Sequence, residues 1–276
     1  MKKKYNQAPL PFMGQKRKFL NKFKEYLMTC PTDATYVDLF GGSGLLSRAV
    51  KDTHPKARVI YNDFDNYKQR IEAIPATNQL LMDIRSMIGE MPKDKRLDQA
   101  LKNEILDRIS KETGFVDYIT ISSSLLFSMN YATCFEDMAK SSFYNCVRLS
   151  DYDASGYLDG LEVVRMSYRE LFKKFEKKQN VLFIVDPPYL STEVGTYTGY
   201  WKLADYLDVL TTLNSKQYFY FTSNKSHILE LCEWMGTYTD YSNPFKNAVI
   251  STTKNTMNYN STYTDIMVFK GYTTTV

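Results

Sequence analysis

The sequence predicts an α/β fold in which a mostly parallel sheet is assembled from both ends of the chain, with a mostly helical insertion in the middle. Near the N-terminus, an apolar run over 34–40, a glycine-rich turn, a helix and a second apolar run over 57–61 follow one another. The same alternation of strands and helices resumes after about residue 160. Such alternation is typical of parallel sheets with right-handed crossovers.

Each element follows from a local pattern. Leu20, Phe23 and Leu27 recur at helical spacing and predict an amphipathic helix over 14–30. A short helix is expected from the glycine-rich turn to about residue 52. The further expected strands are 161–166, 181–185 and 217–222, and the further expected helices are 94–111, a Lys-rich helix before Val181, 202–214 and 226–235. The runs 248–252 and 263–269 predict a terminal antiparallel hairpin.

The pattern changes between these two parts of the chain. Residues 77–160 contain charged helical stretches and, over 130–157, a polar, aromatic segment that has no clear period and many turn residues. We therefore expect one domain to be formed by 1–76 together with 161–276, and 77–160 to be inserted into it.

The composition limits the function classes. The chain has 276 residues, of which 43% are hydrophobic and 24% charged, with a net charge of +4. These values indicate a soluble globular protein, and no apolar run approaches the ~20 residues that a membrane span needs. Its four cysteines are widely spaced, which argues against a metal site or a disulfide framework and favours a reducing cytoplasm. Since there are only two histidines, histidine-based catalysis has few candidates.

The most informative motif is Asp186-Pro187-Pro188-Tyr189, directly after the apolar run 181–185. Ligands of open α/β sheets bind beyond the carboxyl ends of the strands, and two prolines make such a corner rigid. The Asp186 carboxylate and the Pro187 carbonyl could accept both N–H groups of a weakly nucleophilic exocyclic amine, while Tyr189 stacks on its base. Catalysis of this kind rests on positioning and electrostatics. The alternative interpretation is a proline-rich structural turn.

A second candidate site is Asp38-Leu39-Phe40-Gly41-Gly42-Ser43-Gly44, which follows the first expected strand. Glycines at this point let the backbone approach a ligand closely. Asp63 ends the second expected strand, 19 residues after Gly44, about where an acid meets a ribose hydroxyl in nucleotide sites. The spacing differs from Gly-x-Gly-x-x-Gly, which weakens a nicotinamide interpretation.

The order of these motifs resembles that of the Dam-type DNA adenine-N6 methyltransferases (the D12 class, or α group), over roughly residues 9–70 and 160–270. The resemblance implies a Rossmann-like class I fold, the methyl donor S-adenosylmethionine and the product S-adenosylhomocysteine. It also implies that Asp186, Pro187, Pro188 and Tyr189 are catalytic and that 77–160 is a target-recognition domain.

The resemblance further implies which residues bind the cofactor. Residues 11–16 are similar to the family's aromatic-x-Gly-Gly-Lys element, although Gln15 replaces its second glycine. Ser167 and Tyr168 stand where many members have Asp-Phe against the adenine of the cofactor, so the carboxylate of that pair is missing, and a core tyrosine is the alternative for Tyr168. The implied cofactor residues are Phe12, Lys16, Asp38, Phe40, Gly42, Ser43, Gly44, Asp63, Tyr168 and Asp186.

Adenine stacked in a duplex cannot reach such a pocket, so the resemblance implies double-stranded DNA as the partner and flipping of the target base. The expected contacts with DNA are Lys140, Phe143, Tyr144, Asn145, Arg148, Tyr197 and Tyr200. Residues 143–145 match the family's recognition hairpin only vaguely, so no target sequence is transferred. We expect a monomer in the cytoplasm of a bacterial or virus-infected bacterial cell, and the sequence does not determine whether it has a restriction endonuclease partner.

Two alternatives remain open at this stage. One is methylation of adenine in RNA, which a nucleoside digest of treated DNA and RNA would separate from DNA methylation. The other is a nucleic-acid-binding relative that has lost transfer activity. Failure to bind S-adenosylmethionine in calorimetry would favour the second alternative.

Overall fold

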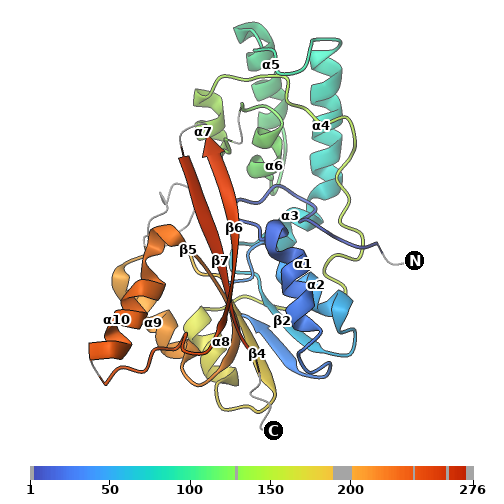
Figure 1. Ribbon diagram of the computed structural model, residues 1–276. Coiled ribbons are helices and arrows are strands. Elements are labelled where there is room, and N and C mark those ends of the chain that lie inside the picture. The colour runs from blue at the N-terminus through green and yellow to red at the C-terminus, as the bar shows by residue number, and fades with distance from the viewer. Residues whose placement is uncertain (1–2, 128–129, 189–200, 239, 259–260, 272–276) are drawn as a thin grey trace. The chain divides into compact units, whose positions relative to one another are not determined.

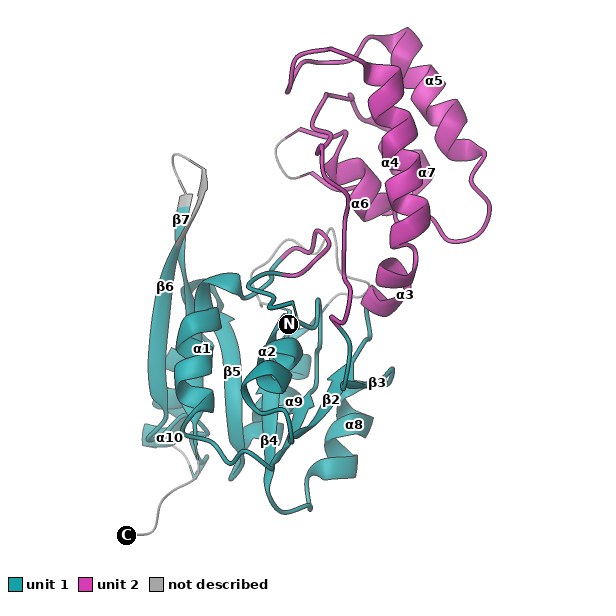
Figure 2. Cartoon of the chain, turned by 90° about the vertical axis from the view of Figure 1, so that its right-hand side faces the viewer, with its two compact units in different colours: residues 1–7, 14–65, 158–276 teal, residues 8–13, 66–157 magenta. Residues whose placement is uncertain are grey.

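The computed structural model describes residues 3–127, 130–188, 201–238, 240–258 and 261–271 (Figure 1). The chain separates into two compact units, which are coloured differently in Figure 2. Unit 1 consists of Met1–Gln7, Gly14–Asp65 and Leu158–Val276, and unit 2 of Ala8–Met13 and Asn66–Tyr157. Both ends of the chain thus contribute to unit 1.

Unit 1 is built on one sheet, whose strands lie in the order β3-β2-β1-β4-β5-β7-β6. The strands are β1 (Thr35–Asp38), β2 (Arg58–Asn62), β3 (Glu162–Val164), β4 (Val181–Val185), β5 (Gln217–Ser223), β6 (Val249–Asn258) and β7 (Ser261–Lys270). Strands β1 to β5 pair parallel with one another, whereas β7 pairs antiparallel with both β5 and β6. The predicted mostly parallel α/β sheet with a terminal hairpin is therefore confirmed.

Helices cover both faces of this sheet (Figure 1). On one face lie η1 (Arg17–Phe19), α1 (Leu20–Leu27) and α2 (Leu45–Thr53), and on the other α8 (Tyr168–Phe175), α9 (Leu203–Leu213) and α10 (Ile228–Tyr238); the short η2 (Asn224–Ser226) precedes α10. Successive side chains of a strand point to opposite faces. Accordingly, Tyr36 packs with α1 and α2, while the next residue, Val37, packs with α8 and α9.

This alternation explains why the strands could be predicted. All five residues of β4 are buried, as expected for a central parallel strand that has helices on both faces. The terminal hairpin is longer than the apolar runs that predicted it. The pairing of β6 with β7 continues through Lys254↔Thr264, whereas the pairing of β5 with β7 ends at Ser223↔Asp265. Polar Thr and Asn side chains concealed this extension in the sequence.

The regular elements among the described residues of unit 2 are helices, joined by loops: α3 (Tyr67–Glu72), α4 (Ile74–Ile88), α5 (Gln99–Ser110), α6 (Tyr118–Ser123) and α7 (Phe135–Lys140). α5 begins later than the predicted residue 94, because the Asp98 carboxylate accepts a hydrogen bond from Leu101 N and caps the helix there. The predicted insertion, 77–160, lies within 66–157 except for its last three residues. Among the described residues, no helix combines the length and the apolar character that a membrane crossing requires.

Candidate active site

Three acidic residues lie at the carboxyl ends of neighbouring parallel strands of unit 1. Asp38 ends β1, Asp63 directly follows β2, and Asp186 directly follows β4. The register pairs Asp38 with Tyr61 on one side and with Ile184 on the other. The two sequence motifs and Asp63 are thus brought to one edge of the sheet, where open α/β sheets bind their ligands.

The loop after β1 has a backbone that favours glycine. Gly41, Gly42 and Gly44 have φ values of +53°, +52° and +73°. A Cβ atom at Gly41 would lie 2.1 Å from the backbone oxygen of Asn62, so a larger residue cannot be accommodated there without movement of the backbone. Since Gly41 N–H is also held by the Asp38 side chain, the loop has a defined conformation.

The Asp38 side chain holds this loop through hydrogen bonds. Its side chain is 2% exposed; Oδ1 accepts a hydrogen bond from Gly41 N at 2.8 Å, and Oδ2 accepts one from Ser47 Oγ at 2.7 Å. Burial raises the pKa of Asp38 to about 6, against the lowering effect of these hydrogen bonds, and the charge of Asp186 raises it further. Because both of its oxygens are engaged, Asp38 is suited to shaping the loop.

Asp63, the predicted ribose-binding acid, is 6% exposed, and its backbone N–H donates to Val164 O at 2.8 Å. The preceding residue, Asn62, connects three strand ends, since its amide nitrogen donates to Leu39 O and to Met166 O at 2.8 and 2.9 Å. Its amide oxygen accepts a hydrogen bond from Met166 N at 3.0 Å. Asn62 was missed in the sequence, although its place next to Asp63 at a strand end could have indicated it.

Asp186 forms an ion pair with Lys16. The distance between Lys16 Nζ and Asp186 Oδ2 is 2.6 Å, and the two side chains are 8% and 24% exposed. Lys16 Nζ also donates to Gly14 O at 2.8 Å and lies 5.8 Å from the ring centre of Phe221. Burial raises the pKa of the Asp186 carboxyl, while Lys16 acts in the opposite direction.

The second carboxylate oxygen of Asp186 has a different environment. Oδ1 is buried and accepts no hydrogen bond from any residue that the structure describes. A buried acceptor of this kind is costly unless a donor reaches it. The carboxylate is therefore fixed through one oxygen and presents the other as an acceptor that a bound donor could satisfy.

An aromatic cluster adjoins this edge of the sheet. The ring centres of Phe40 and Tyr168 are 5.1 Å apart and stacked, and Trp201 stacks on Tyr168 at 5.7 Å. Burial raises the pKa of Tyr168 to about 12. The neighbouring Ser167 caps α8 in a capping box with Glu170, which explains a short hydroxyl side chain at this position. Trp201 was missed because nothing in the sequence links it to Phe40.

Phe12 lies in unit 2, where it packs edge-on against Tyr67 with 5.7 Å between ring centres. The Tyr67 hydroxyl accepts a hydrogen bond from Leu10 N at 2.9 Å and donates to Leu10 O at 3.2 Å. One side chain thus satisfies both backbone groups of a buried residue and holds the segment that carries Phe12.

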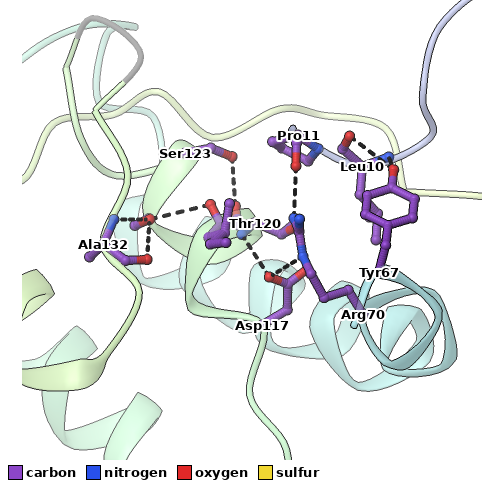
Figure 3. A network of polar contacts seen from close by, with 10 residues as sticks. Leu10, Pro11, Tyr67, Arg70, Asp117, Thr120, Ser123 and Ala132 are labelled. Atoms are coloured by element: carbon purple, nitrogen blue, oxygen red, sulfur yellow. Dashed lines mark hydrogen bonds and ion pairs between the residues drawn. The ribbon is translucent and has the colours of Figure 1, made fainter. Parts of the chain in front are cut away.

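Arg70 reinforces the same segment from α3 (Figure 3). Its guanidinium donates to Pro11 O at 2.8 Å, to Asp117 Oδ1 at 2.9 Å and to Thr120 Oγ1 at 3.1 Å. Arg70 and Asp117 are 5% and 2% exposed, and Asp117 also caps α6. This buried network was not predicted, since its members are distant in the sequence and each alone has the appearance of a surface charge.

Three of the residues expected to contact DNA lie together in unit 2. Phe143 is 1% exposed, with the Lys102 ammonium 5.4 Å from its ring centre. In this structure its ring fills the core of the unit and is not available for a direct contact with DNA, which corrects that expectation. Tyr144 is half-buried and lies 5.3 Å from the ring of Phe127, which is 52% exposed. The Asn145 amide donates to Met91 O at 2.7 Å and so supports a loop.

The expected basic contacts remain accessible. Lys140 is 78% exposed and lies 3.5 Å from Asp137. Arg148 is exposed, stacks its guanidinium 4.1 Å from the ring centre of Tyr152 and donates to Ser150 Oγ. The remaining expected site residues, Tyr189, Tyr197 and Tyr200, lie outside the described residues.

The chain is similar to known proteins. A family model described as D12 class N6 adenine-specific DNA methyltransferase matches residues 12–146. A protein of Haemophilus influenzae named "Putative methyltransferase" is 39% identical over 279 aligned positions, which cover 98% of this chain and 94% of that protein.

Proposed function

Because the chain belongs to the D12 class of N6 adenine-specific DNA methyltransferases, we propose that it transfers a methyl group from S-adenosylmethionine to the N6 amine of a flipped-out adenine in double-stranded DNA. Family membership supports methyl transfer to an adenine amine. The finer statement, with its donor and its duplex substrate, rests on the chemistry of the residues at the sheet edge.

The observation that carries the proposal is the buried Oδ1 atom of Asp186, which has no hydrogen-bond donor among the described residues. Lys16 fixes the other oxygen at 2.6 Å and keeps the carboxylate in place. An exocyclic amine offers the N–H donor that such an oxygen needs, and the Pro187 carbonyl, next along the rigid corner, is proposed to accept its second N–H. Withdrawal of both N–H groups into hydrogen bonds makes the nitrogen lone pair more available.

The bound cofactor would supply an electrophilic methyl carbon on a sulfonium. Transfer would join that carbon to the amine nitrogen and leave the electron pair of the broken carbon–sulfur bond on sulfur, and the amine would lose one proton. Asp186 is placed to receive this proton or to pass it to water. Its raised pKa makes it a stronger proton acceptor than an exposed carboxylate, while Lys16 favours the ionised form that must accept it.

The cofactor is proposed to bind over the loop that Asp38 organises. The positive φ angles of Gly41, Gly42 and Gly44 and the lack of side chains at these positions support a ligand lying against this loop. Asp63 is the proposed partner of the ribose hydroxyls. We keep Phe12, Lys16 and Tyr168 as further cofactor contacts implied by the family, and Lys140, Tyr144 and Arg148 as contacts with DNA.

The test is a methylation assay with S-adenosylmethionine that carries a labelled methyl group. Duplex DNA from a host without adenine methylation and RNA of matched length are treated in parallel, digested to nucleosides and separated. We expect label in N6-methyl-2′-deoxyadenosine from the DNA digest and no label in the RNA digest. Label in RNA alone would show an RNA methyltransferase, and label in another nucleoside would contradict the proposal.

A further inference from the structure

Tyr61, the fourth residue of β2, connects two parts of the proposed cofactor site. Its side chain is fully buried, and its hydroxyl lies 2.8 Å from Gly42 O and 3.1 Å from Asp63 Oδ1. The edge of its ring lies 2.7 Å from where a Cβ atom of Gly41 would be. One phenol therefore contacts both the glycine loop and the acid after the second strand.

Asp63 is two residues further along the chain, on the same face of the strand as Tyr61, whereas the contact with Gly42 does not follow from the sheet ladder. The register places Tyr61 beside Asp38 on β1, but the hydroxyl reaches past that strand to a loop residue 19 positions earlier in the chain. A phenol has one proton, so it donates to Gly42 O or to Asp63 at any moment. Both acceptors belong to the groups assigned above to the cofactor, and no part of the proposed chemistry requires Tyr61 itself.

We propose that Tyr61 is a positioning residue for the methyl donor, which sets the distance between the glycine loop and the Asp63 carboxylate. This inference rests on the proposed function. With the hydroxyl present, the Gly42 carbonyl and the Asp63 side chain both lie within hydrogen-bond distance of one buried phenol before the ligand arrives, which restricts how far they can move apart. Such preorganisation increases affinity because less freedom is lost on binding. Tyr61 acts through Asp63 and the loop, and not on the methyl group.

The matched pair of variants is Tyr61→Phe and Tyr36→Phe. Tyr36 is also fully buried, lies on the adjacent strand β1, and donates its hydroxyl hydrogen bond to a backbone carbonyl, Pro31 O, at 3.0 Å. Each substitution removes one buried hydroxyl and leaves the ring in place. Only the bond of Tyr61 reaches the proposed cofactor groups, so a difference between the variants reports on the site and not on stability.

The measurement is calorimetric titration with S-adenosylmethionine, together with kinetics. A hydrogen bond to a charged group corresponds to roughly a tenfold change in an equilibrium constant, so we expect Tyr61→Phe to raise the Kd about tenfold. Tyr36→Phe should leave the Kd within about twofold, and both variants should have similar melting temperatures. At saturating cofactor, kcat of Tyr61→Phe should stay within about twofold of wild type, since positioning of the donor affects binding first.

A double variant tests the route through the acid. If Tyr61 acts through Asp63, adding Tyr61→Phe to Asp63→Ala should weaken binding by clearly less than it does in the wild-type chain. Full additivity, or an unchanged Kd in Tyr61→Phe while the wild type binds, would overturn the role of Tyr61 alone. No binding by the wild-type chain would overturn the proposed function and this role together.

Discussion

The ion pair between Lys16 and Asp186 allows a sharp test of how the active-site carboxylate is held. Lys16→Met keeps most of the side-chain volume and removes the charge. The pair has a second ion pair as its control, because Lys22 and Glu25 are also 2.6 Å apart but are 47% and 56% exposed. The two pairs therefore share a distance and differ in burial.

Burial sets the expected magnitude. Removing one partner of a buried pair leaves an uncompensated charge and costs about 3–5 kcal/mol, whereas an exposed pair contributes about 0–1 kcal/mol. Since the Asp186 side chain is 24% exposed, we expect Lys16→Met to lower the free energy of unfolding by about 2–3 kcal/mol. Lys22→Met, which breaks the exposed pair, should leave the free energy of unfolding close to that of the wild type.

The dependence on pH identifies the group that is responsible. Without Lys16, the folded-state pKa of Asp186 rises further above its unfolded value, so the stability contribution of this group is present at low pH and lost as pH rises through the folded pKa. The deficit of Lys16→Met should therefore be larger at neutral pH than at acid pH in urea unfolding curves. Asp186→Asn in the Lys16→Met background should recover much of it.

The acid limb of the methyl-transfer rate should also move to higher pH in Lys16→Met. Two results would refute this reasoning. The first is a loss of stability no greater than that of Lys22→Met, and the second is a deficit that is the same at both pH values. Either would mean that the Asp186 carboxylate is held by contacts other than Lys16.

Three further substitutions test the loop and unit 2. Burial raises the pKa of Asp38 to about 6, so its stability contribution is present below about pH 4 and lost as pH rises through about 6. In denaturant unfolding, the free energy of unfolding of the wild type should fall by about 2–3 kcal/mol as the pH rises across that range, and that of Asp38→Asn should not, because Asn does not titrate. The same pH dependence in both proteins would contradict this prediction. Gly41→Ala, whose Cβ would lie 2.1 Å from Asn62 O, should abolish calorimetric binding of S-adenosylmethionine. The control Gly114→Ala, at φ +87° with nothing within 4 Å of the added Cβ, should lower the free energy of unfolding by about 1 kcal/mol and leave binding intact. Equal binding by the two variants would refute the close approach at Gly41. Arg70→Met should lower the free energy of unfolding by about 3–5 kcal/mol, because the buried Asp117 carboxylate loses its compensating positive charge; a loss below about 1 kcal/mol would show that the network is dispensable.

Much of unit 1 could be predicted because its strands are short apolar runs, and burial on both faces of a sheet leaves a clear trace in the sequence. Val181–Val185 has the same limits in the sequence prediction and in the structure. The ends of other elements depend on polar side chains that act locally. Asp98 starts a helix by capping it, which an apolar period cannot indicate.

The site was predicted where motifs follow strands, and it was missed where contacts depend on the tertiary fold. Tyr61 and Asn62 had the appearance of ordinary strand residues, yet their side chains connect loops that lie far apart in the chain. Phe143 was expected to contact DNA because it lies in a polar segment with basic residues, and in the structure its side chain is buried. Local composition does not report which neighbours the fold supplies.

The central claim is that the Asp186 carboxylate accepts a hydrogen bond from the amine that is methylated. Single-turnover methyl transfer by Asp186→Ala tests this claim most directly. With duplex DNA and cofactor both saturating, we expect the rate of N6-methyladenine formation to fall by a factor of about 100 or more. Calorimetry on the same sample should show cofactor affinity within about tenfold of wild type, because Asp186 acts mainly on the amine. A rate close to that of the wild type would contradict the account.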